Sequence, residues 1–240
     1  MLAFVKSDTG MVRKKNEDSY VFKPPHLFVV ADGMGGHLAG EIASDLAVHC
    51  ITDYVEKHTG EKKPDVMLTE AIYLANRMIY EKSLQHSDYT GMGTTVSAVY
   101  LEMNEIYWGH VGDSRIYLFE KSKDNLLQLT ADHSLVWELV ERGELSREEA
   151  DNHPRRNVLT RAVGTGENIS IDTGVVLWKP GDVLFLCTDG LSNMIDEPEL
   201  LCYLKEGYDD GAAAVERLVA KANAVGGYDN ITAILVQNED

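Results

Sequence analysis

Two stretches of the sequence have the same design: an apolar run typical of a buried β-strand ends in an aspartate followed by a glycine. They are "LFVVADG", which ends with Asp32 and Gly33, and "VLFLCTDG", which brings in Asp189. The run "IYWGHVGDSR" delivers Asp113 in the same way. A single Asp-Gly after a strand is usually only a turn, because glycine accepts positive φ and aspartate bonds its own backbone. The repetition predicts instead that carboxylates gather where strands end.

Two more aspartates stand where strands begin. Asp18 in "NEDSYVF" and Asp229 in "GGYDNITAILV" each precede a β-rich run. In an antiparallel sheet the start of one strand lies at the same edge as the end of its neighbour, so all five carboxylates can converge on one edge. Like charges at short range raise pKa values and cost free energy unless cations neutralise them. The alternative interpretation is five solvated acids in turns.

The residue types in this group favour hard cations. Carboxylates without converging Cys or His suit octahedral Mg²⁺ or Mn²⁺ better than Zn²⁺. Two such ions, about 3.5 to 4 Å apart, lower the pKa of a bridging water from 15.7 towards about 7 and clamp an in-line displacement at phosphorus. The expected chemistry is phosphoester hydrolysis. Neither glycine-rich phosphate-binding fingerprint, G-x-G-x-x-G or G-x-x-x-x-G-K-[ST], is present at the turn after Asp32.

The apolar pattern elsewhere predicts an α+β fold. Residues 39–57 and 66–85 carry apolar side chains at three-and-four spacing, which predicts two amphipathic helices. From Gly93 to residue 130 the period becomes two, which predicts an antiparallel meander. Paired helices alternating with runs of short strands indicate antiparallel sheets covered by helices. The later elements are expected in this order: a helical segment at 132–150, two strands around a Pro-Gly turn within 175–190, two helical stretches within 196–223 and a strand at 231–237.

The length of the chain and its net charge limit the number of domains and the classes of binding partner. A chain of 240 residues without low-complexity tract, repeat or Pro/Ser linker predicts a single domain over residues 1–240. The formal charge of −17 repels nucleic acid and anionic membranes, which leaves proteins and metal ions as partners. No apolar run approaches the ~20 residues of a membrane span, and the first residues lack the apolar stretch of a secretory signal. We therefore expect a soluble, cytoplasmic protein.

The three cysteines are predicted to be buried free thiols. Cys50, Cys187 and Cys202 stand in apolar settings without CxxC spacing. An odd number in this pattern argues against disulfides and against a zinc site.

A set of eight short motifs spans nearly the whole chain. In order, they are "SDTGMVRKKNED" (7–18), "VVADGMGGH" (29–37), "GMGTTV" (91–96), "GHVGDSRIY" (109–117), "LTADHS" (129–134), "NVLTRAVG" (157–164), "LCTDGLSN" (186–193) and "GGYDNIT" (226–232). Together they resemble the metal-dependent serine/threonine protein phosphatases (PPM, type 2C), in particular the short bacterial stand-alone members. The resemblance implies a central antiparallel β-sandwich flanked on both faces by pairs of α-helices, in four layers α/β/β/α, with a dinuclear metal site between the sheets at one end.

The resemblance also implies the ligands of that site, residue by residue. Asp32 would bridge both ions, and the carbonyl of Gly33 would ligate one of them. Asp189 and Asp229 would hold the other ion. The implied cofactors are Mn²⁺ or Mg²⁺, two ions per chain with a weaker third.

Four further residues receive roles from the same resemblance. Asp18 would act largely through ordered water, and Asp113 together with Asp189 would form the weaker third site. Glu17 would orient a metal-bound water. Arg13 matches the phosphate-binding arginine of the family, and its planar fork suits two phosphate oxygens better than a lysine would.

One position departs from the pattern of animal members. They place a histidine directly after the bridging Asp-Gly, where it is thought to protonate the leaving oxygen, whereas this chain has Met34. His37 lies three residues further on, and we expect it at the start of a helix in a structural or supporting role.

The segment at about 145–168 corresponds to the variable flap that lies beside the active site in this family. Arg155, Arg156 and Arg161 stand in it, within an otherwise acidic chain. They could attract phosphorylated or acidic substrates, and the alternative is a solvated loop.

The sequence therefore predicts a metal-dependent phosphatase that hydrolyses phosphoserine and phosphothreonine by direct attack of a water activated by two metal ions. Its expected partners are phosphorylated proteins, the substrates of a bacterial Ser/Thr kinase, and we expect a monomer. Two alternatives remain: a phosphatase dedicated to one regulatory partner, such as a stress-response or sporulation factor, and a catalytically silent binding module. The second is disfavoured because every expected ligand is present.

Overall fold

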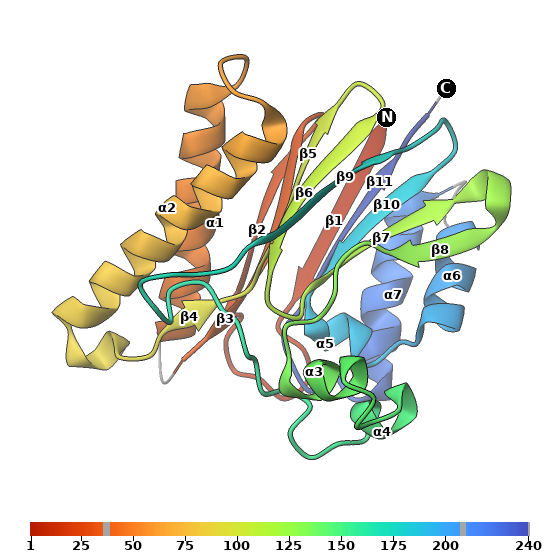
Figure 1. The fold of residues 1–240 in the computed structure, drawn as a ribbon. Coiled ribbons are helices and arrows are strands. Elements are labelled where there is room, and N and C mark those ends of the chain that lie inside the picture. Colours follow the sequence, from red (N-terminus) through yellow and green to blue (C-terminus); the bar gives the residue numbers. More distant parts are fainter. Residues whose placement is uncertain (36–38, 207–209, 240) are drawn as a thin grey trace.

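The computed structural model describes residues 1–35, 39–206 and 210–239. Its strands form two antiparallel sheets that pack face to face (Figure 1). The first sheet contains, in spatial order, β1 (Leu2–Asp8), β11 (Ile231–Gln237), β10 (Val183–Cys187), β7 (Arg115–Glu120) and β8 (Asn125–Gln128). The second contains β2 (Asp18–Lys23), β3 (Leu27–Met34), β5 (Val96–Glu102), β6 (Glu105–Val111) and β9 (Asp172–Leu177), with β4 (Gly93–Thr94) paired to β3.

Helices cover the outer face of each sheet and complete the four layers α/β/β/α. One apolar cluster lies between the first two helices and the second sheet, one lies between the sheets, and one lies between the first sheet and the C-terminal helices. The predicted fold class is confirmed. The helices are α1 (Ala39–His58), α2 (Pro64–Gln85), α3 (Leu135–Glu141), α4 (Arg147–Asp151), α5 (Asp189–Ser192), α6 (Glu197–Glu206) and α7 (Gly211–Val225), with short 3-10 turns at Ser87–Tyr89 and Lys121–Lys123.

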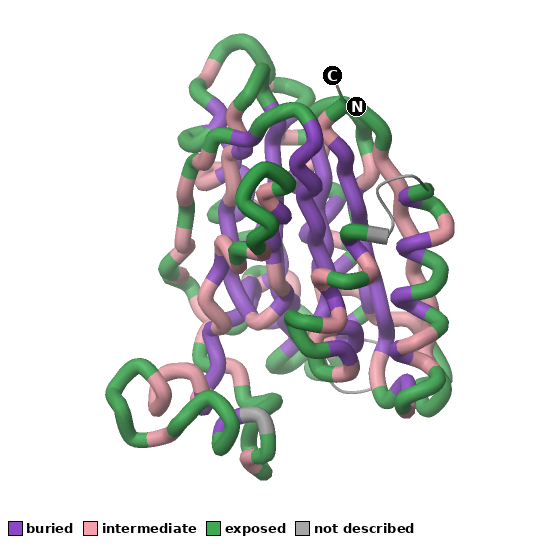
Figure 2. The backbone as a smooth tube through the Cα atoms, turned by 90° about the vertical axis from the view of Figure 1, so that its right-hand side faces the viewer, coloured by how far each residue is buried: buried purple, intermediate pink, exposed green. Residues whose placement is uncertain are grey.

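The apolar periods of the sequence explain these layers. In α1 the side chains of Ala43, Ala47 and Ile51 recur every four residues and are fully buried against the second sheet. Strands β10 and β11 are buried along their whole length, because helices cover one face and the other sheet covers the opposite face. Figure 2 shows the buried strands in the middle of the molecule and the exposed segments around them.

The predicted meander is wrong. Strands β6 and β7 follow each other in the sequence but belong to different sheets, and so do β9 and β10 around their Pro-Gly turn. The chain changes sheet at Gly112, whose φ of +115° favours glycine and where a Cβ would overlap the side chain of Thr95. A period of two identifies strands but not their partners. The crossover leaves Asp113 at the end of the sandwich, between the two sheets.

Smaller differences concern helices and cysteines. The helical segment expected at 132–150 is two helices, because Gly143 adopts a φ of +73° and Ser146 starts α4 with a capping box to Glu149. All three cysteines are free, but Cys202 is exposed on α6 and was wrongly predicted to be buried. His37 lies outside the described residues. In the described parts of the chain, no helix is long and apolar enough to cross a bilayer.

Candidate active site

The five aspartates singled out in the sequence meet at one end of the sandwich. Asp18, the first residue of β2, lies directly opposite Asp32 of β3 in the strand pairing. Asp113 follows β6, Asp189 begins α5 after β10, and Asp229 precedes β11. The other four aspartates are close enough to Asp32 for their charges to act on it. Both sheets therefore contribute to one acidic cluster, formed by these five residues.

The side chain of Asp18 has a raised pKa and one buried oxygen without a partner. Its buried carboxylate accepts hydrogen bonds through Oδ2 from the hydroxyls of Thr188 (2.9 Å) and Thr232 (2.7 Å), while its buried Oδ1 has no partner. Burial raises the pKa of Asp18 to about 7, the two hydroxyl groups oppose the rise, and the charges of Asp189 and Asp229 add to it. A buried oxygen without a partner costs free energy unless water or a cation reaches it.

Three other carboxylates of the acidic cluster are perturbed in the same direction. Burial, followed by repulsion from neighbouring carboxylates, raises the pKa of Asp32, Asp113 and Asp189. Asp189 also has a buried Oδ1 without a partner. Divalent cations relieve both kinds of stress, since they neutralise the repulsion and bind the unpaired oxygens. The donor set of the acidic cluster thus fits hard divalent cations.

The geometry limits how such ions could be held. Within the described residues, no three His, Cys, Asp or Glu side chains stand close enough to enclose one metal ion by themselves. Backbone oxygens and water would have to complete the coordination, as they commonly do around Mg²⁺ and Mn²⁺. The carbonyl of Gly33, the residue after Asp32, is one candidate donor. Gly33 and Gly40 pack so closely that a Cβ on either residue would overlap the carbonyl of the other.

Two threonines that the sequence analysis did not assign hold the peptide of Asp32 in place. Thr95 accepts from the amide of Asp32 through Oγ1 at 2.9 Å, and its own amide donates to the carbonyl of Asp32 at 2.9 Å. The hydroxyl of Thr94 donates to the same carbonyl at 2.9 Å. The motif "GMGTTV" contained both threonines, but only the packing of β4 and β5 against β3 gives them this role.

Arg13 and Glu17 lie on the loop before β2, and the structure brings both to the acidic cluster. Nη2 of Arg13 donates to Oδ2 of Asp229 at 2.7 Å. Asn230 fixes this loop, because its Oδ1 accepts from the amide of Glu17 at 2.8 Å and its Nδ2 donates to the carbonyls of Thr9 and Lys15. Sequence reasoning missed Asn230, although it stands in the quoted motif "GGYDNIT". Burial raises the pKa of Glu17, and the charge of Arg13 opposes that rise.

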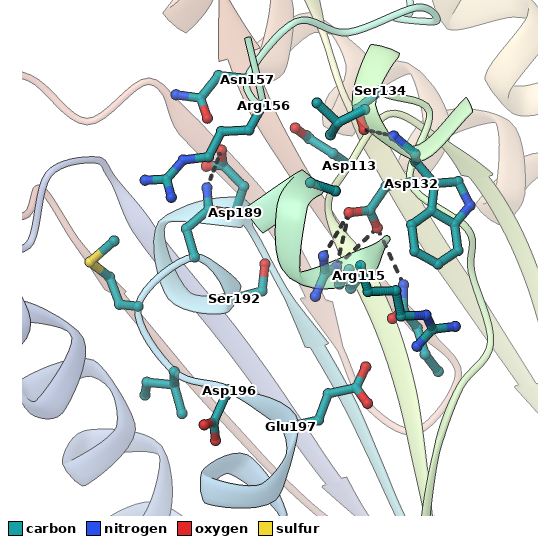
Figure 3. A pocket seen from close by; sticks show the side chains of 18 of the residues that line it. Asp113, Arg115, Asp132, Ser134, Arg156, Asn157, Asp189, Ser192, Asp196 and Glu197 are labelled. Atoms are coloured by element: carbon teal, nitrogen blue, oxygen red, sulfur yellow. Dashed lines mark hydrogen bonds and ion pairs between the residues drawn. The ribbon is translucent and has the colours of Figure 1, made fainter. Parts of the chain in front are cut away.

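A cavity of about 520 Å³ opens beside Asp113 and Asp189. Its walls come from α3 and α4 on one side and from α5 and the start of α6 on the other (Figure 3). Arg115 and Asp132 lie on its floor, where Nε and Nη2 of the arginine donate to the carboxylate at 2.7 to 3.2 Å. The side chain of Trp137 lines the wall, with the guanidinium of Arg147 5.1 Å from its ring centre. The cavity is large enough to receive side chains of a substrate next to the acidic cluster.

The three arginines singled out in the 145–168 segment lie in different surroundings. Arg156 lines the cavity. Arg155 is exposed. Nη1 of Arg161 donates to Oδ1 of Asp172, at the start of β9, at 2.7 Å. Only Arg156 therefore contributes to the cavity beside the acidic cluster.

Known proteins are similar to this chain in sequence and in fold. A family model described as Protein phosphatase 2C matches residues 14–235. The serine/threonine phosphatase stp of Listeria monocytogenes is 40% identical over 246 residues, covering 100% of this chain and 96% of the relative. The serine/threonine phosphatase PstP/Ppp of Mycobacterium tuberculosis superimposes with a TM-score of 0.92 at 33% identity, covering 100% of this chain and 99% of the other. A PstP catalytic domain in complex with two manganese ions gives a TM-score of 0.89 at 32% identity, with coverage of 100% and 98%.

Fold, acidic cluster and relatives define one class of hydrolase. The chain belongs to the protein phosphatase 2C family, the metal-dependent protein serine/threonine phosphatases. Its substrates are phosphorylated proteins.

Proposed function

We propose that the acidic cluster holds two divalent cations, Mn²⁺ or Mg²⁺, and that the chain uses them to hydrolyse phosphoserine and phosphothreonine. Asp32 would contact both ions, the carbonyl of Gly33 would complete one site, and Asp189 with Asp229 would complete the other. The observation that carries the proposal is the group of mutually repelling carboxylates, of which Asp18 and Asp189 each have a buried oxygen without a partner. Bound there, the ions supply charge neutralisation and a water of lowered pKa.

We further propose two supporting roles and a weaker third site. Asp18, with one oxygen held by two threonine hydroxyls, acts through ordered water. Asp113 and Asp189 hold a third, weaker ion, which is supported by the mutual action of their charges. Glu17 would orient a metal-bound water, a role supported by its backbone, which Asn230 fixes at the rim of the acidic cluster.

Arg13 binds and orients the phosphate group in this proposal. Its guanidinium lies at the rim of the acidic cluster and is half exposed, so that a phosphate group can reach it from solvent. A fixed positive charge offsets the repulsion between phosphate and the carboxylates, and the planar fork aligns two phosphate oxygens. Met34 carries no acid or base, so it takes no part in proton transfer.

The setting of the enzyme is also part of the proposal. Residues 1–240 act as one monomeric catalytic domain in the cytoplasm, on substrates of a Ser/Thr kinase, without nucleic acid or membrane as partner. The segment at 145–168 is the flap, since α4 and Arg156 from it line the cavity beside Asp113 and Asp189.

A phosphatase assay on several unrelated phosphothreonine peptides tests the function. With Mn²⁺ the purified protein should turn over the peptides, and with EDTA or with the variant Asp32→Asn it should not. Turnover of a single phosphoprotein and of none of the peptides would indicate a phosphatase dedicated to one partner. No turnover of any substrate with Mn²⁺ would contradict the proposal and indicate a binding module.

A further inference from the structure

The side chain of His133 lies between the sheet crossover at Gly112 and the start of β9. Its Nδ1 accepts from the amide of Gly112 at 3.0 Å, and its own amide donates to the carbonyl of Gly112 at 2.7 Å. On the far side of the ring, Nε2 lies 3.1 Å from Oδ2 of Asp172. Arg161 holds the other oxygen of Asp172. The histidine side chain is only 1% exposed, so these contacts fix it in the interior.

The partners of the ring determine its protonation. A backbone amide can only donate, so Nδ1 of His133 must carry no proton. The neutral ring therefore has its proton on Nε2 and donates it to Asp172. Burial lowers the pKa of His133, although the hydrogen bond to Asp172 opposes that shift, which agrees with a neutral ring.

Gly112, the residue whose amide bonds to the ring of His133 and whose carbonyl bonds to the backbone of His133, immediately precedes Asp113. Gly112 has a φ of +115° and changes the chain from one sheet to the other. On the other side of Asp113, the hydroxyl of Ser114 lies 2.7 Å from that of Thr95, the residue that also holds the peptide of Asp32. Asp113 thus stands between two residues whose positions are fixed from the interior. The ring of His133 supplies the fixed contact on the glycine side.

We propose that His133 is a positioning residue for Asp113: Nδ1 locks the Gly112 peptide, and Asp172 with Arg161 lock the ring. The inference rests on the proposed third ion at Asp113 and Asp189. Partners that orient a metal ligand typically change metal affinity 10- to 100-fold when removed. Through Asp172 and Arg161 the same contact joins the base of the 145–168 segment to the acidic cluster.

Two substitutions of His133 distinguish the contact at Nδ1 from the contact at Nε2. In His133→Asn the amide oxygen can take the place of Nδ1 and accept from Gly112. In His133→Gln the longer side chain can reach Asp172 but leaves the amide of Gly112 without its acceptor. We expect His133→Gln to lower the affinity for the third Mn²⁺ ion by about tenfold or more. In His133→Asn that affinity should stay within about threefold of the wild-type value. The two tighter ions should be unchanged in both variants.

Calorimetric Mn²⁺ titration and hydrogen exchange at the amide of Gly112 provide the readouts. Exchange at Gly112 should be faster in His133→Gln than in His133→Asn. Leu218→Ala, in the apolar cluster between α7 and the first sheet, is the control for destabilisation. It should lower Tm without changing the affinity for the third ion. If His133→Gln does not fold, Asp172→Ala tests the same contact at a more exposed position. Without Asp172 the ring is free to turn Nδ1 away from the amide of Gly112, whereas the shorter side chain of His133→Asn accepts from that amide without support from Asp172. Asp172→Ala should therefore weaken binding of the third ion.

Three outcomes decide the matter. Selective loss of the third ion in His133→Gln supports the inference. The inference would be overturned if both histidine variants bound the third ion with wild-type affinity, or if both lost the same affinity. In either case, loss of the third ion in Asp113→Ala would still support the proposed third site. An unchanged third ion in Asp113→Ala would overturn the third site and this inference together, without touching the proposed two-ion phosphatase.

Discussion

Arg13 and Asp229 form an ion pair at the rim of the acidic cluster, with Nη2 of the arginine 2.7 Å from Oδ2 of the aspartate. The arginine side chain is 52% exposed and the aspartate 30% exposed, so the pair is open to solvent and contributes little stability by itself. Its interest is functional, because the aspartate is a proposed metal ligand and the arginine the proposed phosphate ligand. A cation bound at Asp229 would compete with this guanidinium, so the proposal couples metal binding to the availability of Arg13.

The first prediction concerns Arg13. Arg13→Ala should cost on the order of 2 to 4 kcal/mol in kcat/KM, because phosphate then enters an acidic site without a fixed counter-charge. Arg13→Lys should be intermediate, since an ammonium keeps the charge but not the fork. The affinity for Mn²⁺ should stay the same or rise slightly, because Asp229 loses its competing partner. Steady-state kinetics on one phosphothreonine peptide, paired with Mn²⁺ titration, measure both effects. A wild-type kcat/KM in Arg13→Ala would remove the arginine from phosphate binding.

Asp32 should be indispensable for a different reason. As the proposed bridge between two ions, it cannot be replaced by an amide, so Asp32→Asn should abolish turnover and weaken Mn²⁺ binding while the fold persists. Removing the charge also removes repulsion from the acidic cluster, so the metal-free variant should not be less stable than metal-free wild type. Calorimetric titration and thermal melting check the two statements. Unchanged Mn²⁺ affinity in a folded variant would exclude Asp32 from the metal centre.

The variant Asp113→Ala should distinguish the proposed third metal site from the proposed two-ion centre. Asp113→Ala should lose most activity yet still bind two Mn²⁺ ions, because Asp32, Asp189 and Asp229 remain. Metal counting by native mass spectrometry gives the number of bound ions directly. A variant that binds no metal at all would show that Asp113 belongs to the central pair rather than to a separate site.

The acidic cluster should make metal binding depend on pH. Burial raises the pKa of Asp18 to about 7, so the metal-free folded protein holds a proton there that an unfolded chain, with a carboxyl pKa near 4, has already released. The metal-free fold therefore loses stability as pH rises from about 4 through about 7. Mn²⁺ bound to the acidic cluster would displace that proton, so its affinity should rise up to about tenfold per pH unit for each proton displaced.

Thermal melting with Mn²⁺ or with EDTA, at pH 5.5 and at pH 7.5, measures this dependence. The loss of Tm on adding EDTA should be larger at the higher pH. Titration in two buffers of different ionisation enthalpy should detect the released proton. The same Mn²⁺ affinity at both pH values would show that no carboxylate with a raised pKa takes part in binding.

His110 should give the opposite pH dependence. Burial lowers its pKa to about 3, and the ring is neutral between Ser97 and the carbonyl of Ala131. Unfolding below pH 6.5 takes up a proton that the folded ring excludes, so the stability due to this group is complete above pH 6.5 and is lost as pH falls towards 3, by up to about 1.4 kcal/mol per pH unit. Denaturant titration of wild type and His110→Gln at pH 7 and pH 5.5 isolates the effect. Parallel losses in the two proteins would contradict it.

Much of the candidate site could be predicted from local sequence. An aspartate at the end or start of an apolar run must lie at a sheet edge, because the run itself is buried, and this places Asp18, Asp32 and Asp189 correctly. The motif resemblance, spread over nearly the whole chain, gave the four layers. The residues that hold the site in place were not predictable. Thr95 bonds to the peptide of Asp32, about 60 positions away, and Asn230 bonds to the amide of Glu17, more than 200 positions away.

The sequence by itself determined most of the buried positions, the aspartates that lie where strands begin or end, and the fold class that accommodates both, because the hydrophobic period and turn chemistry are local properties. Only the tertiary structure decided which strands pair. The crossover at Gly112 sends β6 and β7 to different sheets, an arrangement that no local pattern distinguishes from a meander, because both bury the same side chains. That crossover places Asp113 beside Asp189 and gives His133 a peptide to hold. The acidic cluster is therefore encoded residue by residue in the sequence, but its shape results from long-range packing between the two sheets.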